Sequence, residues 1–494
     1  MKKYILPLAA LLSLGGCSKL EETPYSSIFT DNFYKTAGDA EGAIAAVYGA
    51  LATMYAGPGP LMFGDFCADQ VYPRPVVARD VFTLFTYDAA YSAIVSFNRA
   101  NESPITVWNT GYDGIVKANW VLGKVPQIPM DTKRREEILG EAYFMRAYFH
   151  WMLTKNFRDV VIKTNTSKSL DEANQGLRPK AEVYQQIFSD LDEAAKRLPS
   201  YSANLVKGRA SKEAALGLHA KAALYNENWT LALQKAQEVI ASGRHSLMPD
   251  VRDVFTASKE DAARIETMFA FEAEAVAPAR TSQIMGLYGP PGSNGAEYGP
   301  TTFGSIFVYP TFYDSFDPAD KRRALMETSY LNRAGVRVPQ QSITPITPKG
   351  ILVRKYQDPT GIGASHNINI PLLRYADVLL IAAEAEARQN GATPVAYGYI
   401  NQVRTRAGLP NLRSGLSKDD FIAAVLQERS WELFSEGDRW YDLTRTNTFM
   451  QVVPKAVNDV FPTRTPQAKH RYFPIPQDEI NANPLVKQSP EWQQ

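Results

Sequence analysis

The sequence has few cysteines, few histidines and no excess of charge of either sign. Two cysteines, Cys17 and Cys67, can form neither a cysteine-built zinc site nor a network of disulfides. The five histidines are scattered and no HExxH motif occurs, so we expect no bound metal and no cofactor. The 53 basic and 52 acidic side chains nearly cancel, which argues against a nucleic-acid partner. Apolar residues make up 45% of the 494, so a large globular core is expected rather than disorder.

The N-terminus carries an apolar stretch that is too short to cross a bilayer, within MKKYILPLAALLSLGGC. Its two lysines, apolar centre and small residues before Cys17 resemble a bacterial lipobox, in which the cysteine is acylated and the chain is cut before it. We therefore expect residues 1–16 to be a lipoprotein signal peptide, Cys17 to carry the lipid, and residues 17–28 to form a tether. An ordinary signal peptide with an incidental cysteine is the alternative.

Most of the patterned sequence repeats apolar residues with the period of an α-helix. In 135–157, for example, one face of a helix would carry Ile138, Ala142, Met145 and Phe149. The cap residues support the same assignment, because serine is a favoured N-cap and glycine commonly ends a helix. The helices expected are 135–157, 181–198, one after the N-cap Ser211 as far as Tyr225, 229–242 ending at Gly243, 372–390 and 394–407.

Pairs of these helices resemble tetratricopeptide units, which pack through small residues. We expect an all-α fold, a tetratricopeptide-like helical-repeat superhelix. Long irregular insertions rich in Gly, Pro, Tyr and Phe interrupt it at 55–115 and 276–375, and binding sites commonly lie in such insertions. Within the second insertion, residues 286–313 are too broken by Gly and Pro for a helix or strand core, so their aromatic residues are expected on loops.

Seven segments, in order along the chain, resemble the SusD/RagB family of outer-membrane nutrient-binding lipoproteins. They are TPYSSIFTDNFYKTAGDAEGAIAAVYGAL, EAYFMRAYFHWMLTKNF, RPKAEVYQQIFSDLDEAAKRLP, LLRYADVLLIAAEAEARQ, YINQVRTRAGLP, FIAAVLQERSWELFSEGDRWYDLTRT and HRYFPIPQDEINANPLVKQSPEW. The chain departs from the family at FRDVVIKTN, where a Gly and a Pro are usual. The resemblance implies an N-terminal SusD-like region with tetratricopeptide-like helices at 29–265 and a C-terminal SusD/RagB region at 266–494, packed together as one unit.

The resemblance also implies a function. Such a protein is anchored by lipid in the outer membrane, faces the cell exterior, and captures oligosaccharide or polysaccharide for a SusC-like TonB-dependent transporter. A peptide-binding protein of the RagB kind is the nearest alternative. An extracellular glycosidase and a structural tetratricopeptide adaptor are the alternatives from other functional classes.

A run of charged residues near the C-terminus could be mistaken for a catalytic centre. Glu428, Glu432 and Glu436 recur every four residues, so they project in parallel from one helix face. A glycosidase instead needs two carboxylates on opposite sides of the bond that it cleaves. We therefore expect structural ion pairs and no catalytic residue, with Arg404 and Arg406 as possible further partners. The residues assigned to these pairs are Glu428, Arg429, Glu432, Glu436, Arg439 and Arg445.

The candidate ligand contacts are aromatic and amide side chains of the two insertions. Aromatic rings cover the apolar face of a sugar, and a few amides or hydroxyls orient it. Aromatic residues on the helices are more simply core residues. The candidates are Tyr72, Tyr87, Tyr91 and Asn98 in the first insertion, and Tyr288, Asn294, Tyr298, Phe303 and Tyr309 in the second.

The segment GDFCAD contains two further acids, Asp65 and Asp69. Two carboxylates without the spacing of a calcium-binding loop are weak grounds for a metal site, so we expect solvated loop acids. Cys67, between them, is expected to be a small buried residue.

Overall fold

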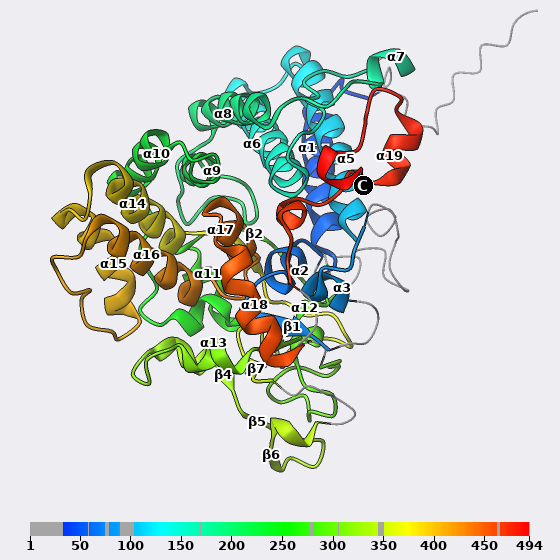
Figure 1. The fold of residues 1–494 in the computed structure, drawn as a ribbon. Helices are drawn as coiled ribbons and strands as arrows, with labels where there is room; N and C mark the ends of the chain where they lie inside the picture. Colours follow the sequence, from blue (N-terminus) through cyan, green and yellow to red (C-terminus); the bar gives the residue numbers. More distant parts are fainter. Residues whose placement is uncertain are drawn as a thin grey trace, which may run out of the picture.

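Long helices form an arc along one side of the molecule, and short strands and loops fill the other side (Figure 1). This computed structural model describes residues 33–57, 59–74, 79–88, 103–167, 169–276, 281–304, 306–343, 350–461 and 465–493. The α-helices are α1 (Ala37–Tyr55), α2 (Gly59–Phe66), α3 (Asp80–Leu84), α5 (Pro104–Lys124), α6 (Thr132–Phe157), α7 (Leu170–Ala173), α8 (Lys180–Arg197), α9 (Lys212–Tyr225), α10 (Trp229–Ser242), α11 (Glu260–Ala263), α12 (Ile284–Tyr288), α13 (Pro310–Asp314), α14 (Tyr375–Asn390), α15 (Pro394–Arg406), α16 (Lys418–Glu432), α17 (Arg439–Arg445), α18 (Phe449–Val460) and α19 (Gln477–Ala482).

The arc is a superhelix of neighbouring helix pairs, which confirms the tetratricopeptide-like, mainly helical fold. Packing runs in the order α1, α5, α6, α8, α9, α10, α14 and α15, with α16 against α14. Helix α6 lies between α5 and α8 and is therefore buried on several sides, not only along the predicted stripe. Where α5 crosses α6, Gly114 lies against the ring of Phe149, and a Cβ at position 114 would come within 2.2 Å of that ring. The small residue thus permits the close approach of the two helices.

Local sequence signals place most helix ends correctly. The Ser211 hydroxyl accepts a hydrogen bond from the Ala214 amide at 3.1 Å and caps α9 as predicted. Gly243 ends α10 with a φ of 61°, a left-handed conformation that glycine adopts without steric cost. Helix α8 likewise ends just before Pro199. The helix predicted from residue 372 begins only at Tyr375, because the preceding residues form a strand.

The strands form four antiparallel pairs: β1 with β3, β2 with β8, β4 with β7 and β5 with β6. They join segments that are far apart in sequence. Their bounds are β1 (Val71–Pro73), β2 (Thr267–Phe271), β3 (Ile306–Val308), β4 (Met326–Glu327), β5 (Ser329–Leu331), β6 (Arg337–Pro339), β7 (Leu352–Val353) and β8 (Ile370–Arg374). The expectation that 286–313 forms no helix or strand is therefore wrong, because β3 lies within it and α12 and α13 overlap its two ends. Strand β3 is stabilised by its partner β1, which no local pattern reveals.

One hydrophobic core contains residues from both predicted regions of the chain. Helices α9 and α10 pack against α14, and α2 packs against α17. At the last contact two glycines meet: a Cβ on Gly64 would lie 1.9 Å from the carbonyl oxygen of Gly437. In the part of the chain that the structure describes, no helix combines the length and the hydropathy needed to cross a membrane.

Candidate functional site

Five of the tyrosines predicted to contact ligand lie in the core. Tyr72, Tyr298 and Tyr309 have no exposed surface, Tyr288 is 2% exposed and Tyr87 is 3% exposed. Rings that are covered on both faces cannot stack on a sugar, so the predicted platform does not form from these tyrosines. The reason is tertiary packing, because Tyr72 and Tyr309 are brought together by the β1–β3 pair, with ring centroids 4.6 Å apart.

The other candidates have different surroundings. Phe303 is half-buried, and its ring lies 2.8 Å from where a Cβ of Gly286 would be. Asn294 is exposed, and its side-chain oxygen accepts a hydrogen bond from the Ala296 amide at 3.0 Å. Tyr91 and Asn98 lie outside the described residues, as does the predicted lipidation site Cys17. Contact of Asn294 with a ligand stays a prediction.

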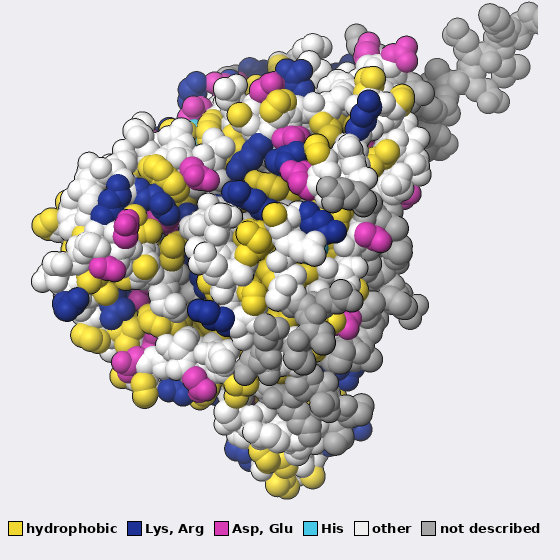
Figure 2. All heavy atoms as spheres, in the orientation of Figure 1, with side chains coloured by type: hydrophobic (Ala, Val, Ile, Leu, Met, Phe, Trp, Pro, Cys, Tyr) yellow, Lys and Arg dark blue, Asp and Glu magenta, His cyan; other side chains and the backbone are white. Residues whose placement is uncertain are grey.

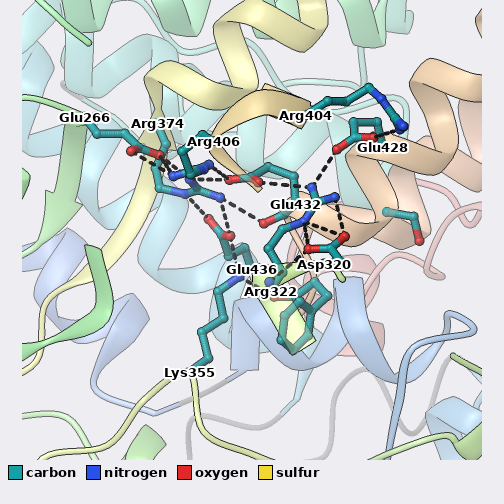
Figure 3. Close-up of polar contacts among 12 residues, drawn as sticks. Glu266, Asp320, Arg322, Lys355, Arg374, Arg404, Arg406, Glu428, Glu432 and Glu436 are labelled. Atoms are coloured by element: carbon teal, nitrogen blue, oxygen red, sulfur yellow. Dashed lines mark hydrogen bonds and ion pairs between the residues drawn. The ribbon is translucent and has the colours of Figure 1, made fainter. Parts of the chain in front are cut away.

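The three glutamates of the C-terminal charged segment form a buried ionic network (Figure 3). Glu428 pairs with Arg322 at 2.7 Å and Arg404 at 2.9 Å. Glu432 lies 2.5 Å from Arg406, 2.9 Å from Arg374 and 3.3 Å from Arg322. All three carboxylates therefore have cationic partners, as the charge pattern predicted.

The third glutamate, Glu436, ties a strand and a loop to the same network. Its carboxylate lies 2.6 Å from the Lys355 ammonium and 2.8 Å from the Arg374 guanidinium. Arg374 ends β8 and also pairs with Glu266 at 2.6 Å, just before β2. The network thus holds the β2–β8 pair against α16.

Three predicted arginines pair with other acids than the ones expected. Arg429 bonds to Asp377 at 2.6 Å and Asp442 at 2.8 Å. Arg445 pairs with Glu384 at 2.6 Å, and Arg439 with Asp69 at 2.7 Å. The sequence placed the three arginines near the glutamates, but Arg429 on α16 and Arg439 and Arg445 on α17 pair with acids of other segments. The partners that sequence reasoning missed are Arg322, Lys355 and Arg374, which come from distant segments.

This network is unsuited to acid–base catalysis. Burial opposes charge on Glu432, but the three arginines outweigh it and lower its pKa to about 2. A carboxylate held in the charged form is no proton donor at neutral pH, and a side chain without exposed surface cannot reach a substrate. The described residues also contain no group of three side chains able to hold a metal ion.

The GDFCAD segment is buried, which corrects the expectation of solvated acids. Asp65 is 1% exposed, and its Oδ1 accepts a hydrogen bond from the Gly437 amide at 3.0 Å. Burial raises the pKa of Asp65 to about 8. Asp69 pairs with Arg439, and Cys67 is a buried free thiol as expected. These groups stabilise the contact between α2 and the turn before α17.

A polar cavity of about 420 Å³ lies at the second insertion, and we call it the insertion cavity. The short 3-10 helix Val251–Phe255 and the 3-10 helix Lys321–Leu325 form part of its walls. Arg354 is exposed, and its guanidinium lies 3.4 Å from the Gln357 side-chain oxygen. The lining therefore offers both hydrogen-bond donors and acceptors. The lining residues are Arg252, Asp253, Phe255, Thr256, Ala296, Glu297, Ala324, Leu325, Arg354, Lys355, Gln357 and Pro359.

Family comparisons match both parts of the chain. The model described as "SusD family" matches residues 290–492, and the model described as "Starch-binding associating with outer membrane" matches residues 39–224. A SusD-like protein of Formosa agariphila is 26% identical, over 99% of this chain and 98% of its own. A SusD-like protein of Bacteroides ovatus is 24% identical, over 93% of this chain and 85% of its own.

Solved structures of SusD-like proteins have the same fold. A laminarin-binding SusD-like protein superposes with a TM-score of 0.78 at 24% identity, covering 92% of this chain and 100% of that one. Surface glycan-binding protein A from Bacteroides thetaiotaomicron, in complex with laminarihexaose, gives a TM-score of 0.74 at 21% identity, covering 92% and 99%. The present chain matches SusD family models in both of its parts, has SusD-like relatives along nearly its whole length, and shares their helical superhelix. It therefore belongs to the SusD/RagB family.

Proposed function

We propose that this chain is a surface-exposed, lipid-anchored protein that binds oligosaccharide or polysaccharide and delivers it to a SusC-like TonB-dependent transporter. The observation that carries the proposal is the likeness over nearly the whole chain to a laminarin-binding protein and to a protein in complex with laminarihexaose. Both are binding proteins by their names. The chain acts by binding and not by catalysis, because its densest carboxylate cluster is buried and neutralised.

We assign sugar contact to the insertion cavity. Its accessible side chains, Arg354, Gln357 and Asp253, offer hydrogen-bond donors and acceptors around an opening at the surface of an insertion. Phe255 forms an apolar part of the wall, with the Lys355 ammonium 4.4 Å from its ring. Recognition there would depend more on hydrogen bonds than on stacking, because the rings of the insertion are mostly turned into the core.

Calorimetry with neutral glucans tests the proposal. The protein lacking residues 1–17 is titrated with laminarin and starch oligosaccharides and with a mixture of peptides. We expect glucan binding that falls tenfold or more when Arg354→Ala and Gln357→Ala are combined. Arg333→Ala removes an exposed arginine from the neighbouring β5–β6 turn and should change affinity less than twofold. Binding of peptides alone would refute the glycan proposal in favour of a RagB-like function.

Lipid attachment and the transporter are tested in cells. Cys17→Ser should abolish incorporation of labelled palmitate and release the protein from the membrane fraction. A tagged wild-type protein should retain a large outer-membrane β-barrel protein on affinity purification in mild detergent. Membrane retention of the serine variant would contradict the anchor, and purification without a barrel partner would contradict the transporter.

A further inference from the structure

A second cavity shares no lining residue with the insertion cavity. It lies between the C-terminal end of α6, the start of α8 and the C-terminal segment. Its volume is about 350 Å³, and a narrower pocket adjoins it through Lys180, Arg471 and Tyr472. We call the two together the C-terminal groove. Figure 2 shows Lys and Arg side chains gathered among hydrophobic ones in the middle of this face, over α6 and the C-terminal segment of Figure 1. The wider part is lined by Phe157, Arg158, Lys180, Ala468, Lys469, Arg471, Tyr472, Ser489, Glu491 and Trp492.

Positive charge dominates this groove. Four of its cationic side chains, those of Lys155, Lys180, Lys469 and Arg471, make no ion pair with a carboxylate among the described residues. The one acid among the described residues that line it, Glu491, is already bonded to Arg158 at 2.5 Å. The ionic network around Glu432 is different, because there every cation has a carboxylate partner.

Each of the four cations lies instead over an aromatic ring. The Lys469 ammonium is 4.8 Å from the centroid of the Trp492 ring, and the Arg471 guanidinium is 5.7 Å from that of Tyr472. The Lys180 ammonium is 5.5 Å from the Tyr184 ring. Such contacts hold a cation in place but leave its N–H groups free to donate to an anion.

Lys155 lies deepest, in the narrow part of the groove. Its ammonium is 4.3 Å from the Tyr441 ring and 4.4 Å from the Trp151 ring. Burial lowers the pKa of Lys155 to about 7, although Asp438 partly opposes this. An anion bound beside it would favour its charged form. The described residues therefore supply no ion-paired carboxylate for these four half-buried cations.

We propose that the C-terminal groove is a second ligand site, which binds the carboxylate or sulfate-ester groups of an acidic saccharide. The choice of a saccharide rests on the proposed function, whereas the preference for an anion rests on the groove alone. The near-zero net charge of the chain disfavours long polyanions such as nucleic acids, so an anion would be attracted by the local cations of this groove and not by a broad field. The half-buried Tyr472 and Trp492 supply apolar surface beside the charges, which a sugar ring can cover.

The test compares four probes on the mature-length chain by calorimetry. Oligogalacturonate carries carboxylates, a sulfated galactan oligosaccharide carries sulfates, a laminarin oligosaccharide is neutral, and polyglutamate is an acidic peptide. We expect the wild type to bind at least one acidic saccharide, with affinity falling as salt rises. The acidic saccharide that binds with the higher affinity shows whether the groove prefers carboxylate or sulfate groups.

Variants locate the binding. Lys469→Ala combined with Arg471→Ala should weaken the acidic saccharide tenfold or more and leave laminarin binding unchanged. Arg471→Lys, which keeps the charge, should retain much of the affinity and shows that packing is intact. Lys133→Ala removes an exposed lysine at the opposite end of α6 and should change affinity less than twofold.

Three results would overturn the second site. They are no binding of either acidic saccharide, equal binding by the double variant, and binding of polyglutamate alone. Laminarin binding that depends on Arg354 but not on Arg471 would leave the proposed function intact in each of these cases. Loss of laminarin binding together with persistent acidic-saccharide binding would instead retain the groove and remove the insertion cavity.

Discussion

Replacing Glu432 by glutamine tests whether the ionic network is structural. Glu432 lies among Arg322, Arg374 and Arg406, and its side chain has no exposed surface. Glutamine has the same shape and keeps an oxygen acceptor, but it removes the negative charge that three guanidinium groups share. The arginines would keep their other partners, such as Glu266 and Glu436, so the fold should survive with lower stability.

Two independent arguments give the magnitude. Lowering the pKa of Glu432 from 4.5 to about 2 corresponds to about 3 kcal/mol in favour of the charged form in the folded protein. Removing one partner of a buried ion pair typically costs about 3–5 kcal/mol. We therefore expect Glu432→Gln to lower the free energy of unfolding by about 3–4 kcal/mol at pH 7.

The pH dependence provides a second signature. Because the pKa of Glu432 is depressed, its contribution is fully present above the unfolded value of 4.5 and is lost as the pH falls toward 2. The stability difference between wild type and variant should therefore be constant from pH 8 to pH 5 and shrink below pH 4.5.

Urea unfolding followed by circular dichroism measures the difference, with Asp113→Asn as the control. Asp113 pairs with Lys117 on the exposed face of α5 at 2.6 Å, with half of its side chain exposed, so its loss should cost about 1 kcal/mol or less. A loss below 1 kcal/mol for Glu432→Gln would refute the structural argument. So would a glycan hydrolysis by the wild type that disappears in the variant.

Three further predictions concern the contact between α2 and the turn before α17. Burial raises the pKa of Asp65 to about 8, so the stability that its neutral form provides is full below pH 3.8 and is lost as the pH rises through 8. In urea unfolding, the free energy of unfolding of Asp65→Asn should therefore rise relative to that of the wild type over this range. A difference that does not depend on pH would contradict this. Gly64→Ala should cost about 3 kcal/mol or more, since its Cβ would meet the Gly437 carbonyl at 1.9 Å, whereas Gly49→Ala, with open space around it, should be neutral or stabilising. Burial raises the pKa of Cys67 well above its usual value, so a thiol reagent should label it only after unfolding; rapid labelling of the native protein would show that this contact opens.

The helical scaffold could be predicted from the sequence because a helix is stabilised by residues that are close together in the sequence. The stripe through Ile138 and Phe149, the cap at Ser211 and the stop at Gly243 are all local signals, and each corresponds to an observed feature of the structure. The two arginines that pair with the glutamates as predicted, Arg404 and Arg406, also come from the adjacent hairpin.

The strands and the burial of the tyrosines could not be predicted in this way. Strand β8 looked like the start of α14, because its partner β2 lies in a distant part of the chain. Tyr72 and Tyr309 looked like loop residues, and only the β1–β3 pairing brings them together in the core. The C-terminal groove was missed for the same reason, since α6, α8 and the last residues contribute its cations from separate segments.

The meeting of Gly64 with Gly437 also constrains the order in which the protein can fold. Helix α2 is formed by residues 59–66, yet its packing partner α17 ends at residue 445. Contacts of such large sequence separation form late, because the loop between them must first be closed. The N-terminal helices can associate while the chain emerges, but the face of α2 that packs on α17 stays exposed until residues 439–445 have been made. A chain truncated before α17 would therefore be recognised by chaperones and proteases as unfinished.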